Sequence, residues 1–121
     1  MANLYTGVDM IEVRRLREAI ARHGDRFLRR IYTHNELAQM NGNLPSLAAR
    51  FAAKEAVAKA LGTGIGDLSW QDVEILRGNR KEPVLQLYGA AQKLAKKRGI
   101  KRWSLSISHT HDHALAFVVA T

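Results

Sequence analysis

The chain has 121 residues, enough for one hydrophobic core, so we expect a single domain over residues 1–121. Cysteine is absent, which excludes disulfides and cysteine metal cages and is compatible with a reducing compartment. Nineteen Lys and Arg residues against eleven Asp and Glu give a formal net charge of +8. This charge attracts an anionic partner, but it does not distinguish nucleic acid from an acidic protein or a phosphorylated small molecule.

The N-terminal segment starts Met1-Ala2-Asn3 and soon reaches the acidic Asp9 and Glu12, unlike the basic start and apolar run of a signal peptide. No stretch approaches the roughly 20 consecutive apolar residues that cross a bilayer. We therefore expect a cytoplasmic chain without a membrane partner.

The first quarter of the chain predicts a strand and two basic helices. Apolar and polar residues alternate loosely over 4–10, which predicts a short strand whose end presents Asp9. Residues 12–23 carry apolar side chains at spacings of three and four, which predicts a helix, and residues 25–31 form a shorter one after Gly24. Seven arginines gather on these two helices: Arg14, Arg15, Arg17, Arg22, Arg26, Arg29 and Arg30.

The middle of the chain predicts a short helix followed by a long one. Thr33 and Glu36 have the spacing of a capping box, and the Asn-Gly-Asn sequence at 41–43 ends the helix that they begin. After Pro45, residues 47–61 are rich in alanine and free of glycine and proline, which predicts a helix. We expect its apolar side chains to form a buried stripe and its charged ones to take the remaining surface: Arg50, Lys54, Glu55 and Lys59.

The second half predicts strands around one helix. Alternating residues predict a strand at 70–76 that returns at 83–87, and residues 88–98 predict a basic helix. Residues 103–108 and 114–120 predict a hairpin. The pattern indicates an α+β fold in which helices pack against one side of a mostly antiparallel sheet.

Two clusters could carry chemistry. Glu55 and Lys59 lie one helical turn apart and lead into a glycine-rich turn at 62–66, so they could bind magnesium and steady a phosphate. Spacing alone favours the alternative, a solvated ion pair, because such pairs are common on helices. The alternating histidines of residues 109–113 could form a transition-metal site, but a turn in this segment favours exposed histidines instead.

Four motifs occur in one order along the chain: GVD at 7–9, RFAAKEAVAKALGTG at 50–64, WQDVEI at 70–75 and LSISHT at 105–110. Together they resemble the signatures of the holo-acyl-carrier-protein synthases, the small phosphopantetheinyl transferases of bacteria. The resemblance extends over nearly the whole chain. It favours a binding role for Glu55 and Lys59 over a solvated ion pair.

This resemblance implies an enzyme that transfers 4′-phosphopantetheine from coenzyme A to a serine of an acidic acyl carrier protein and releases adenosine 3′,5′-bisphosphate. It implies that Asp9 and Glu55 are the protein ligands of Mg²⁺, an ion that commonly takes one or two carboxylates. Lys59 would stabilise phosphate charge in the transition state. The general base stays open between Glu55 and a water on the metal, and we favour the water because a metal-binding carboxylate is a weak base.

The resemblance also implies how the coenzyme and the subunits are arranged. Arg50, His109 and Thr110 would hold the nucleotide end with its 3′-phosphate, and Gly62 and Gly64 would let the backbone approach the ligand closely. A homotrimer with active sites at the subunit junctions is implied as well, so Arg50 and His109 could act across a junction.

The arginine-rich helices resemble the part of this family that docks the carrier protein. Arginine makes forked contacts with carboxylates, and such charges speed the encounter with an acidic partner. We expect Arg15, Arg22 and Arg26 to contact the carrier, with Phe27 as an apolar anchor.

Two other classes of function are alternatives. A basic nucleic-acid-binding module would use the arginine segment and residues 93–102, but it would leave Asp9, Glu55 and Lys59 unexplained. The presence of the same three residues argues against a scaffold protein that has kept the fold and lost the activity. We therefore expect no nucleic-acid partner.

Overall fold

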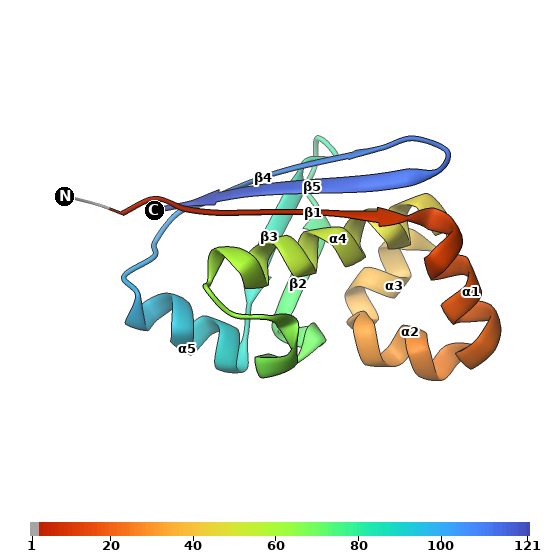
Figure 1. The fold of residues 1–121 in the computed structure, drawn as a ribbon, viewed down its shortest axis with the longest axis horizontal. Coiled ribbons are helices and arrows are strands. Elements are labelled where there is room, and N and C mark those ends of the chain that lie inside the picture. The colour runs from red at the N-terminus through yellow and green to blue at the C-terminus, as the bar shows by residue number, and fades with distance from the viewer. Residues whose placement is uncertain (1–2) are drawn as a thin grey trace.

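The computed structural model describes residues 3–121, so Met1 and Ala2, where we expect no signal peptide, lie outside the described residues. Within residues 3–121, no helix is long and apolar enough to cross a membrane. Figure 1 shows the long strands of the molecule side by side above a central helix, α4 (Leu44–Ala60). In chain order the elements are β1 (Tyr5–Glu12), α1 (Val13–His23), α2 (Asp25–Ile31), α3 (His34–Met40), α4 (Leu44–Ala60), two 3-10 turns (Ile65–Asp67 and Trp70–Asp72), β2 (Val73–Arg77), β3 (Pro83–Leu87), α5 (Gly89–Lys97), β4 (Trp103–His109) and β5 (His113–Ala120).

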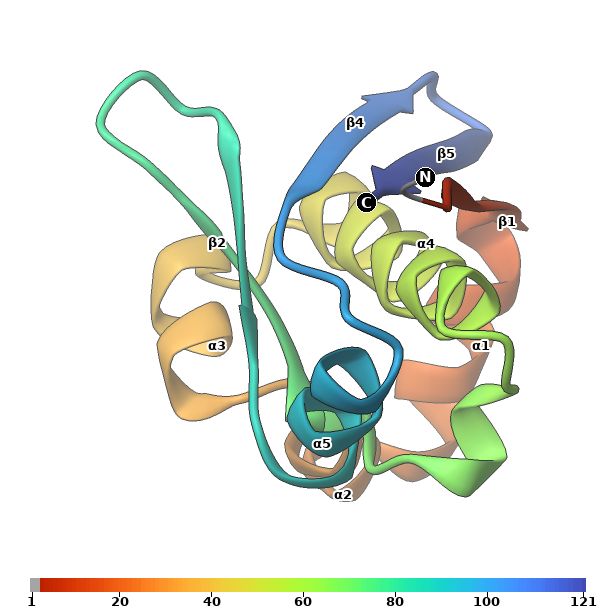
Figure 2. The same ribbon diagram turned by 90° about the vertical axis from the view of Figure 1, so that its left-hand side faces the viewer.

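The strands form two antiparallel sheets rather than one. β1, β5 and β4 make a three-stranded sheet in that order, and β2 pairs with β3 in a separate hairpin. α4 covers the inner face of the three-stranded sheet, and the β2–β3 hairpin flanks α4 (Figure 2). The predicted α+β fold, with helices on one side of antiparallel strands, is confirmed, and the division into two sheets adds to it.

The outer face of the three-stranded sheet lies on the side away from α4 (Figure 1), and it carries exposed apolar side chains along β1 and β5. Val8 lies opposite Phe117, and Met10 lies opposite Leu115, so the four side chains form one cross-strand patch. Their exposed fractions are 50%, 45%, 63% and 41%, respectively. A large exposed apolar patch of this kind usually marks a contact surface.

α4 differs from its prediction at its start and in what it buries. It begins earlier than predicted, at Leu44, where the Asn43 side chain accepts a hydrogen bond from Ser46 N at 2.9 Å. The expectation that every charged side chain of this helix lies on the surface is wrong, because Arg50 is 6% exposed and Lys54 is 0% exposed. Tertiary packing causes this burial, because strands and helices contact α4 on several sides at once.

Other boundaries shift by a few residues. β1 continues to Glu12, so Asp9 lies inside the strand and not at its end, and β2 starts at Val73, after a 3-10 turn, and not at residue 70. α2, β3 and the β4–β5 hairpin lie at or within one residue of their predicted positions. The predicted capping box is confirmed: Glu36 N donates to Thr33 Oγ1 at 3.1 Å, and Thr33 N donates to Glu36 Oε1 at 2.8 Å.

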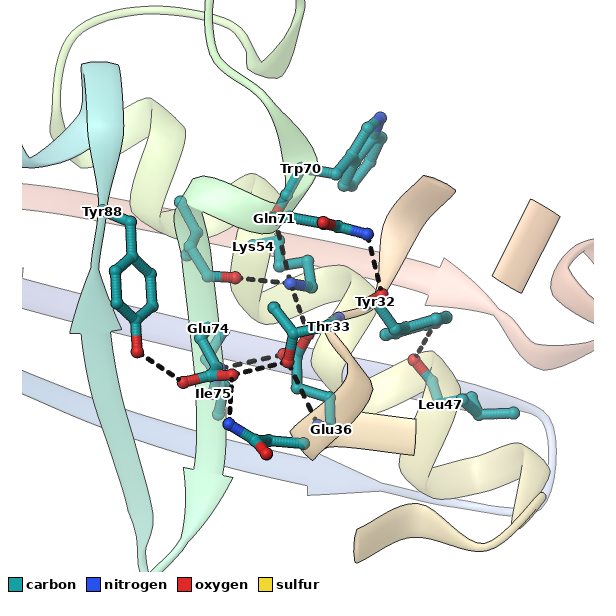
Figure 3. A network of polar contacts seen from close by, with 12 residues as sticks. Tyr32, Thr33, Glu36, Leu47, Lys54, Trp70, Gln71, Glu74, Ile75 and Tyr88 are labelled. Carbon is teal, nitrogen blue, oxygen red and sulfur yellow. Dashed lines mark hydrogen bonds and ion pairs between the residues drawn. The ribbon is translucent and has the colours of Figure 1, made fainter. Parts of the chain in front are cut away.

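A buried ion pair joins α3, α4 and the start of β2 (Figure 3). Lys54 Nζ donates to Glu36 Oε1 at 2.8 Å, to Trp70 O at 3.1 Å and to Val73 O, so all three ammonium protons have acceptors. The second oxygen of Glu36 accepts from Ile75 N at 2.9 Å. Burial lowers the pKa of Lys54, and the neighbouring Glu36 carboxylate opposes that shift. Because both charges are paired and hydrogen-bonded, three elements are held at one point.

A second buried carboxylate extends this network along β2. Glu74 is 2% exposed, and it accepts hydrogen bonds from Thr33 Oγ1 at 2.6 Å and from Tyr88 OH at 3.0 Å. The hydrogen bond to Glu74 raises the pKa of Tyr88. Val73 and Ile75, on either side of Glu74, belong to the apolar core that packs against α4. β2 is therefore buried on both faces, one apolar and one polar.

Replacing Lys54 by methionine should lower the free energy of unfolding by about 3–5 kcal/mol, because the Glu36 carboxylate would stay buried without its cation. Chemical and thermal unfolding measure this loss. The double variant Lys54→Met/Glu36→Gln keeps a side chain that can accept hydrogen bonds but removes both charges, so it should recover part of the stability. A single variant as stable as the double variant would show that the two charges are not coupled.

Candidate active site

Asp9 and Glu55 line one cavity at the edge of β1, with a volume of about 470 Å³. We call it the Asp9–Glu55 cavity. Two acidic residues that are distant in sequence therefore converge, as the sequence interpretation requires. β1, α1, α2 and α4 supply its walls, which consist of Asp9, Met10, Ile11, Arg15, Leu16, Ala19, Phe27, Phe51, Glu55 and Lys59.

Lys59 connects α4 to β1 at this cavity. Its Nζ donates to Val8 O at 2.9 Å and forms an ion pair with Asp9 Oδ1 at 3.2 Å. The side chain of Lys59 is 52% exposed, so the pair contributes little to stability. Its ammonium group is nevertheless fixed by a backbone acceptor, which suits it to hold an anion beside the cavity.

The electrostatics of the cavity favour a bound cation. Burial raises the pKa of Glu55, the charge of Asp9 raises it further, and Lys59 opposes both. Two carboxylates that repel each other across one cavity are stabilised by a cation that both can bind. Mg²⁺ commonly takes one or two carboxylates and completes its shell with water and phosphate oxygens, so this donor set fits Mg²⁺.

The histidines near the C-terminus do not form a metal centre. Over the range 3–121, no group of three or more His, Cys, Asp and Glu side chains is placed to hold a metal ion. His109 ends β4 and His113 begins β5, and the chain turns between them, where His113 N donates to Thr110 Oγ1 at 3.1 Å. Both side chains are exposed, as the favoured interpretation of this segment predicts.

The close contact of β1 with α4 positions Asp9 relative to Glu55. Gly7 faces α4, and a Cβ atom at this position would lie 1.8 Å from Ala56 O and 3.0 Å from Ala60 N. Glycine on the strand and alanine on the helix therefore let the two backbones meet. Asp9 points to the same side of β1 as Gly7, because alternate strand residues share a face, and so it is carried onto α4 beside Glu55.

The glycine-rich turn follows the last turn of α4. Gly62 has a φ angle of 82°, a conformation that favours glycine, whereas Gly64 has a φ angle of −87°. Thr63 Oγ1 donates to Asp67 Oδ2 at 2.6 Å and fixes the turn from within. A Cβ atom at Gly64 would meet its nearest neighbour, Gly66 N, at 4.0 Å, so the backbone there is accessible.

The residues expected to dock the carrier divide between two adjoining cavities. Arg15 and Phe27 line the Asp9–Glu55 cavity, and Arg22 and Arg26 line a second cavity of about 490 Å³. Phe27 belongs to both. The arginine helices therefore form a continuous rim beside the acidic pair, which the spacing of the arginines alone did not show.

Three residues that were expected to hold the nucleotide lie elsewhere. Arg50 is buried near Glu36 of α3, and His109 and Thr110 are exposed at the β4–β5 hairpin. None of these three residues lines the Asp9–Glu55 cavity within one chain. Conversely, Leu16 forms part of its apolar wall, a role that its place on the apolar side of α1 could have suggested.

Comparison with known proteins identifies relatives over nearly the whole chain. Residues 5–118 match the family described as the 4′-phosphopantetheinyl transferase superfamily. The chain is 46% identical over 123 residues to a holo-[acyl-carrier-protein] synthase of Herpetosiphon aurantiacus, covering 96% of this chain and 97% of that protein. It is 50% identical over 117 residues to one of Dehalococcoides mccartyi, covering 97% and 98%. Its fold matches that of a Helicobacter pylori holo-[acyl-carrier-protein] synthase in complex with coenzyme A, with a TM-score of 0.88 and 32% identity over 96% of this chain and 99% of that one.

Replacing Gly7 by alanine should push β1 away from α4, because the new Cβ atom has no room beside Ala56 O. We expect a loss of about 1–3 kcal/mol in the free energy of unfolding, or more, and a lower melting temperature. The control is Thr6→Ala, which changes an exposed neighbour on the same strand and should cost no more than about 0.5 kcal/mol. Equal stability of the two variants would contradict the close approach.

Proposed function

The chain belongs to the 4′-phosphopantetheinyl transferase superfamily, and from that premise we propose that it acts in the cytoplasm as a single catalytic domain over residues 1–121. The reaction transfers 4′-phosphopantetheine from coenzyme A to a serine of an apo-acyl carrier protein and releases adenosine 3′,5′-bisphosphate. The observation that carries this proposal is the convergence of Asp9, Glu55 and Lys59 at one cavity. A nucleic-acid-binding module gives these three residues no role.

Asp9 and Glu55 would hold Mg²⁺. When bound, this ion neutralises the coenzyme A diphosphate and stabilises the negative charge that grows on its bridging oxygen. Burial and, after it, the charge of Asp9 raise the pKa of Glu55, which agrees with this role because a bound cation offsets both costs of the charged carboxylate.

Lys59 would bind the diphosphate beside the two carboxylates. Its hydrogen bond to Val8 O holds the ammonium group in place, while half of its side chain stays open to a ligand. A fixed cation stabilises charge in the transition state at little cost of reorganisation. Lys59 therefore stabilises the negative charge on the phosphoryl group and does not accept the proton of the serine.

The carrier serine attacks the phosphorus on the pantetheine side, a new P–O bond forms, and the bond to the bridging oxygen breaks. The serine proton passes to a water molecule hydrogen-bonded to Glu55 and from that water to the solvent. A carboxylate that also ligates a cation is too weak a base to take the proton directly.

The coenzyme would lie against the end of α4 and a neighbouring subunit. Gly62 and Gly64 offer accessible backbone at the turn after α4, and Arg50 lies on the same helix. His109 and Thr110 are exposed on the β4–β5 hairpin, where they are available to an adjacent chain. We assign all five residues to coenzyme binding.

The apolar outer patch of the sheet supports a homotrimer. Val8, Phe117 and Leu115 are between 41% and 50% exposed in one chain and would be buried against a neighbour. Met10 belongs both to this patch and to the wall of the Asp9–Glu55 cavity, so a subunit seated on the patch would border the active site. A solution mass equal to one chain would contradict this assignment.

Arg15, Arg22, Arg26 and Phe27 would dock the carrier. They line the two cavities that adjoin at Phe27, so an acidic helix bound there would lie next to the carboxylate pair. Guanidinium groups contact carboxylates through two parallel hydrogen bonds, which orients as well as attracts the partner.

Incubation with apo-carrier, coenzyme A and Mg²⁺ should add one phosphopantetheine to the carrier, as measured by intact mass. Glu55→Gln should lower the rate by at least about 100-fold, because one metal ligand loses its charge, while the melting temperature stays close to that of the wild type. Full activity in Glu55→Gln would remove the metal assignment. No mass increase with any carrier would remove the proposed reaction.

Charge reversal at Arg22 and Arg26 should raise the KM for the carrier at least about tenfold and leave the KM for coenzyme A unchanged, because both side chains lie outside the Asp9–Glu55 cavity. The matched control is a double charge reversal at Lys96 and Lys97, which are exposed on α5. A carrier KM that rises equally in both double variants would indicate only a long-range effect of net charge.

A further inference from the structure

The side-chain amide of Gln71 closes the C-terminal end of α2. Its Nε2 donates one hydrogen bond to Tyr32 O at 3.1 Å (Figure 3) and another to Arg29 O. Arg29 lies in the last turn of α2, and Tyr32 is the residue that caps it. Gln71 belongs to the 3-10 turn Trp70–Asp72, 39 residues beyond Tyr32, so this cap comes from a distant part of the chain.

The two carbonyls need a side-chain donor because α3 takes the backbone donors. In a continuing helix, Thr33 N would donate to Arg29 O. Glu36 N would donate to Tyr32 O in the same way. Both N–H groups instead belong to the capping box of α3, where Thr33 N donates to Glu36 Oε1 at 2.8 Å and Glu36 N donates to Thr33 Oγ1 at 3.1 Å. The Gln71 amide therefore supplies the two hydrogen bonds that a further turn of helix would have given.

The main chain on both sides of Gln71 is held in place. The carbonyl of Trp70 accepts a hydrogen bond from the buried ammonium group of Lys54 at 3.1 Å. The carbonyl of Asp72 accepts one from Tyr88 N at 2.8 Å. The amide of Gln71 therefore projects from a fixed support, which is tied to α4 on one side and to the start of α5 on the other.

The orientation of α2 depends on how its ends are held. The helix is seven residues long, its N-cap is Gly24, which has no side chain to accept a hydrogen bond, and Ile31 is the buried residue in Asp25–Ile31. A helix this short has little stability of its own in water. Arg26 and Phe27 lie in its first turn, so their direction depends on the contacts that hold its last turn.

We infer that Gln71 is a positioning residue for carrier binding, because it fixes the orientation in which α2 presents Arg26 and Phe27. This inference rests on the proposed function for the identity of the partner. Phe27 lines both adjoining cavities and Arg26 lines one of them, so a rotation of α2 would displace an apolar contact and a cation together. The same 3-10 turn also supports the cavity wall, because the Trp70 ring packs on Phe51 with centroids 4.7 Å apart.

The first test replaces Gln71 by methionine, which keeps a side chain of similar length and removes both donors without changing the charge. Gln71→Met should raise the KM for the carrier at least about fivefold and leave the KM for coenzyme A unchanged. The matched control is Gln92→Met, the same change at an exposed position of α5, which should alter neither value. An unchanged KM for the carrier in Gln71→Met, or an equal rise for both substrates, would overturn the inference.

A double-mutant cycle tests whether Gln71 acts through α2. In the background Arg26→Gln/Phe27→Ala, the contacts that Gln71 would position are already lost. Adding Gln71→Met should then raise the KM for the carrier by less than about twofold. A rise as large as in the wild-type background would place the effect outside α2 and overturn the inference.

Amide hydrogen exchange on the full-length protein without a carrier separates this inference from the proposed reaction. Gln71→Met should speed the exchange of the α2 amide protons at least about fivefold and leave those of α4 unchanged. Faster exchange in α2 would support the positioning role even if no carrier were modified and the proposed function failed. Unchanged exchange in α2 would overturn the positioning role even if the carrier reaction took place.

Discussion

The backbone contact between β1 and α4 is the constraint on which the active site depends. Gly7 meets Ala56 so closely that a β-carbon would overlap the helix carbonyl, and this contact fixes the height of β1 above α4. The side chain of Asp9, two residues further on, then reaches the helix surface at Glu55 and Lys59. A strand held at the ordinary packing distance from a helix would keep the same topology but separate the two carboxylates. The site thus depends on the absence of a side chain at position 7.

α4 can position β1 and Asp9 because the opposite side of the helix is itself held in place. Lys54, in the middle of the helix, binds Glu36 of α3 and the carbonyls of Trp70 and Val73. These contacts set both the rotation and the position of α4 relative to the β2 hairpin. Glu55 is the next residue along the chain and, by the rotation of about 100° per residue in a helix, faces away from this network toward β1. The buried ion pair therefore orients the Glu55 carboxylate, which it does not touch.

The sequence predicted the local features well and the long-range ones poorly. The capping box at Thr33 and the ends of α2 and β3 depend on neighbouring residues, and they lie where the pattern places them. The burial of Lys54 depends on Glu36, 18 residues away, and on Val73, 19 residues away, so no helical pattern could show it. The alanine-rich composition of α4 gave an indirect signal, because small residues on several sides of a helix suit close packing all round it.

The site itself was predictable only through the order of its motifs. The spacing of Glu55 and Lys59 favoured a solvated ion pair on one helix, whereas the partner that Lys59 contacts is Asp9, 50 residues away. The family resemblance brought Asp9 together with Glu55, and the fold explains this convergence through the close approach of β1 to α4.

Lys54 and Arg50 show that one helix can bury two cations in different ways. Both side chains lie on α4, four residues apart, and both are buried cations. Every ammonium proton of Lys54 has an acceptor, whereas Nε of Arg50 has none among residues 3–121. A buried cation with all its partners is compatible with a stable empty protein, but one without them raises the free energy of that state. The same reasoning applies to the carboxylate pair, where burial and Asp9 raise the pKa of Glu55. Among residues 3–121, Arg50 Nε is the one buried side-chain nitrogen or oxygen atom without a hydrogen-bond partner, so the unfavourable electrostatics of α4 gather at Arg50 and at the Glu55 carboxylate.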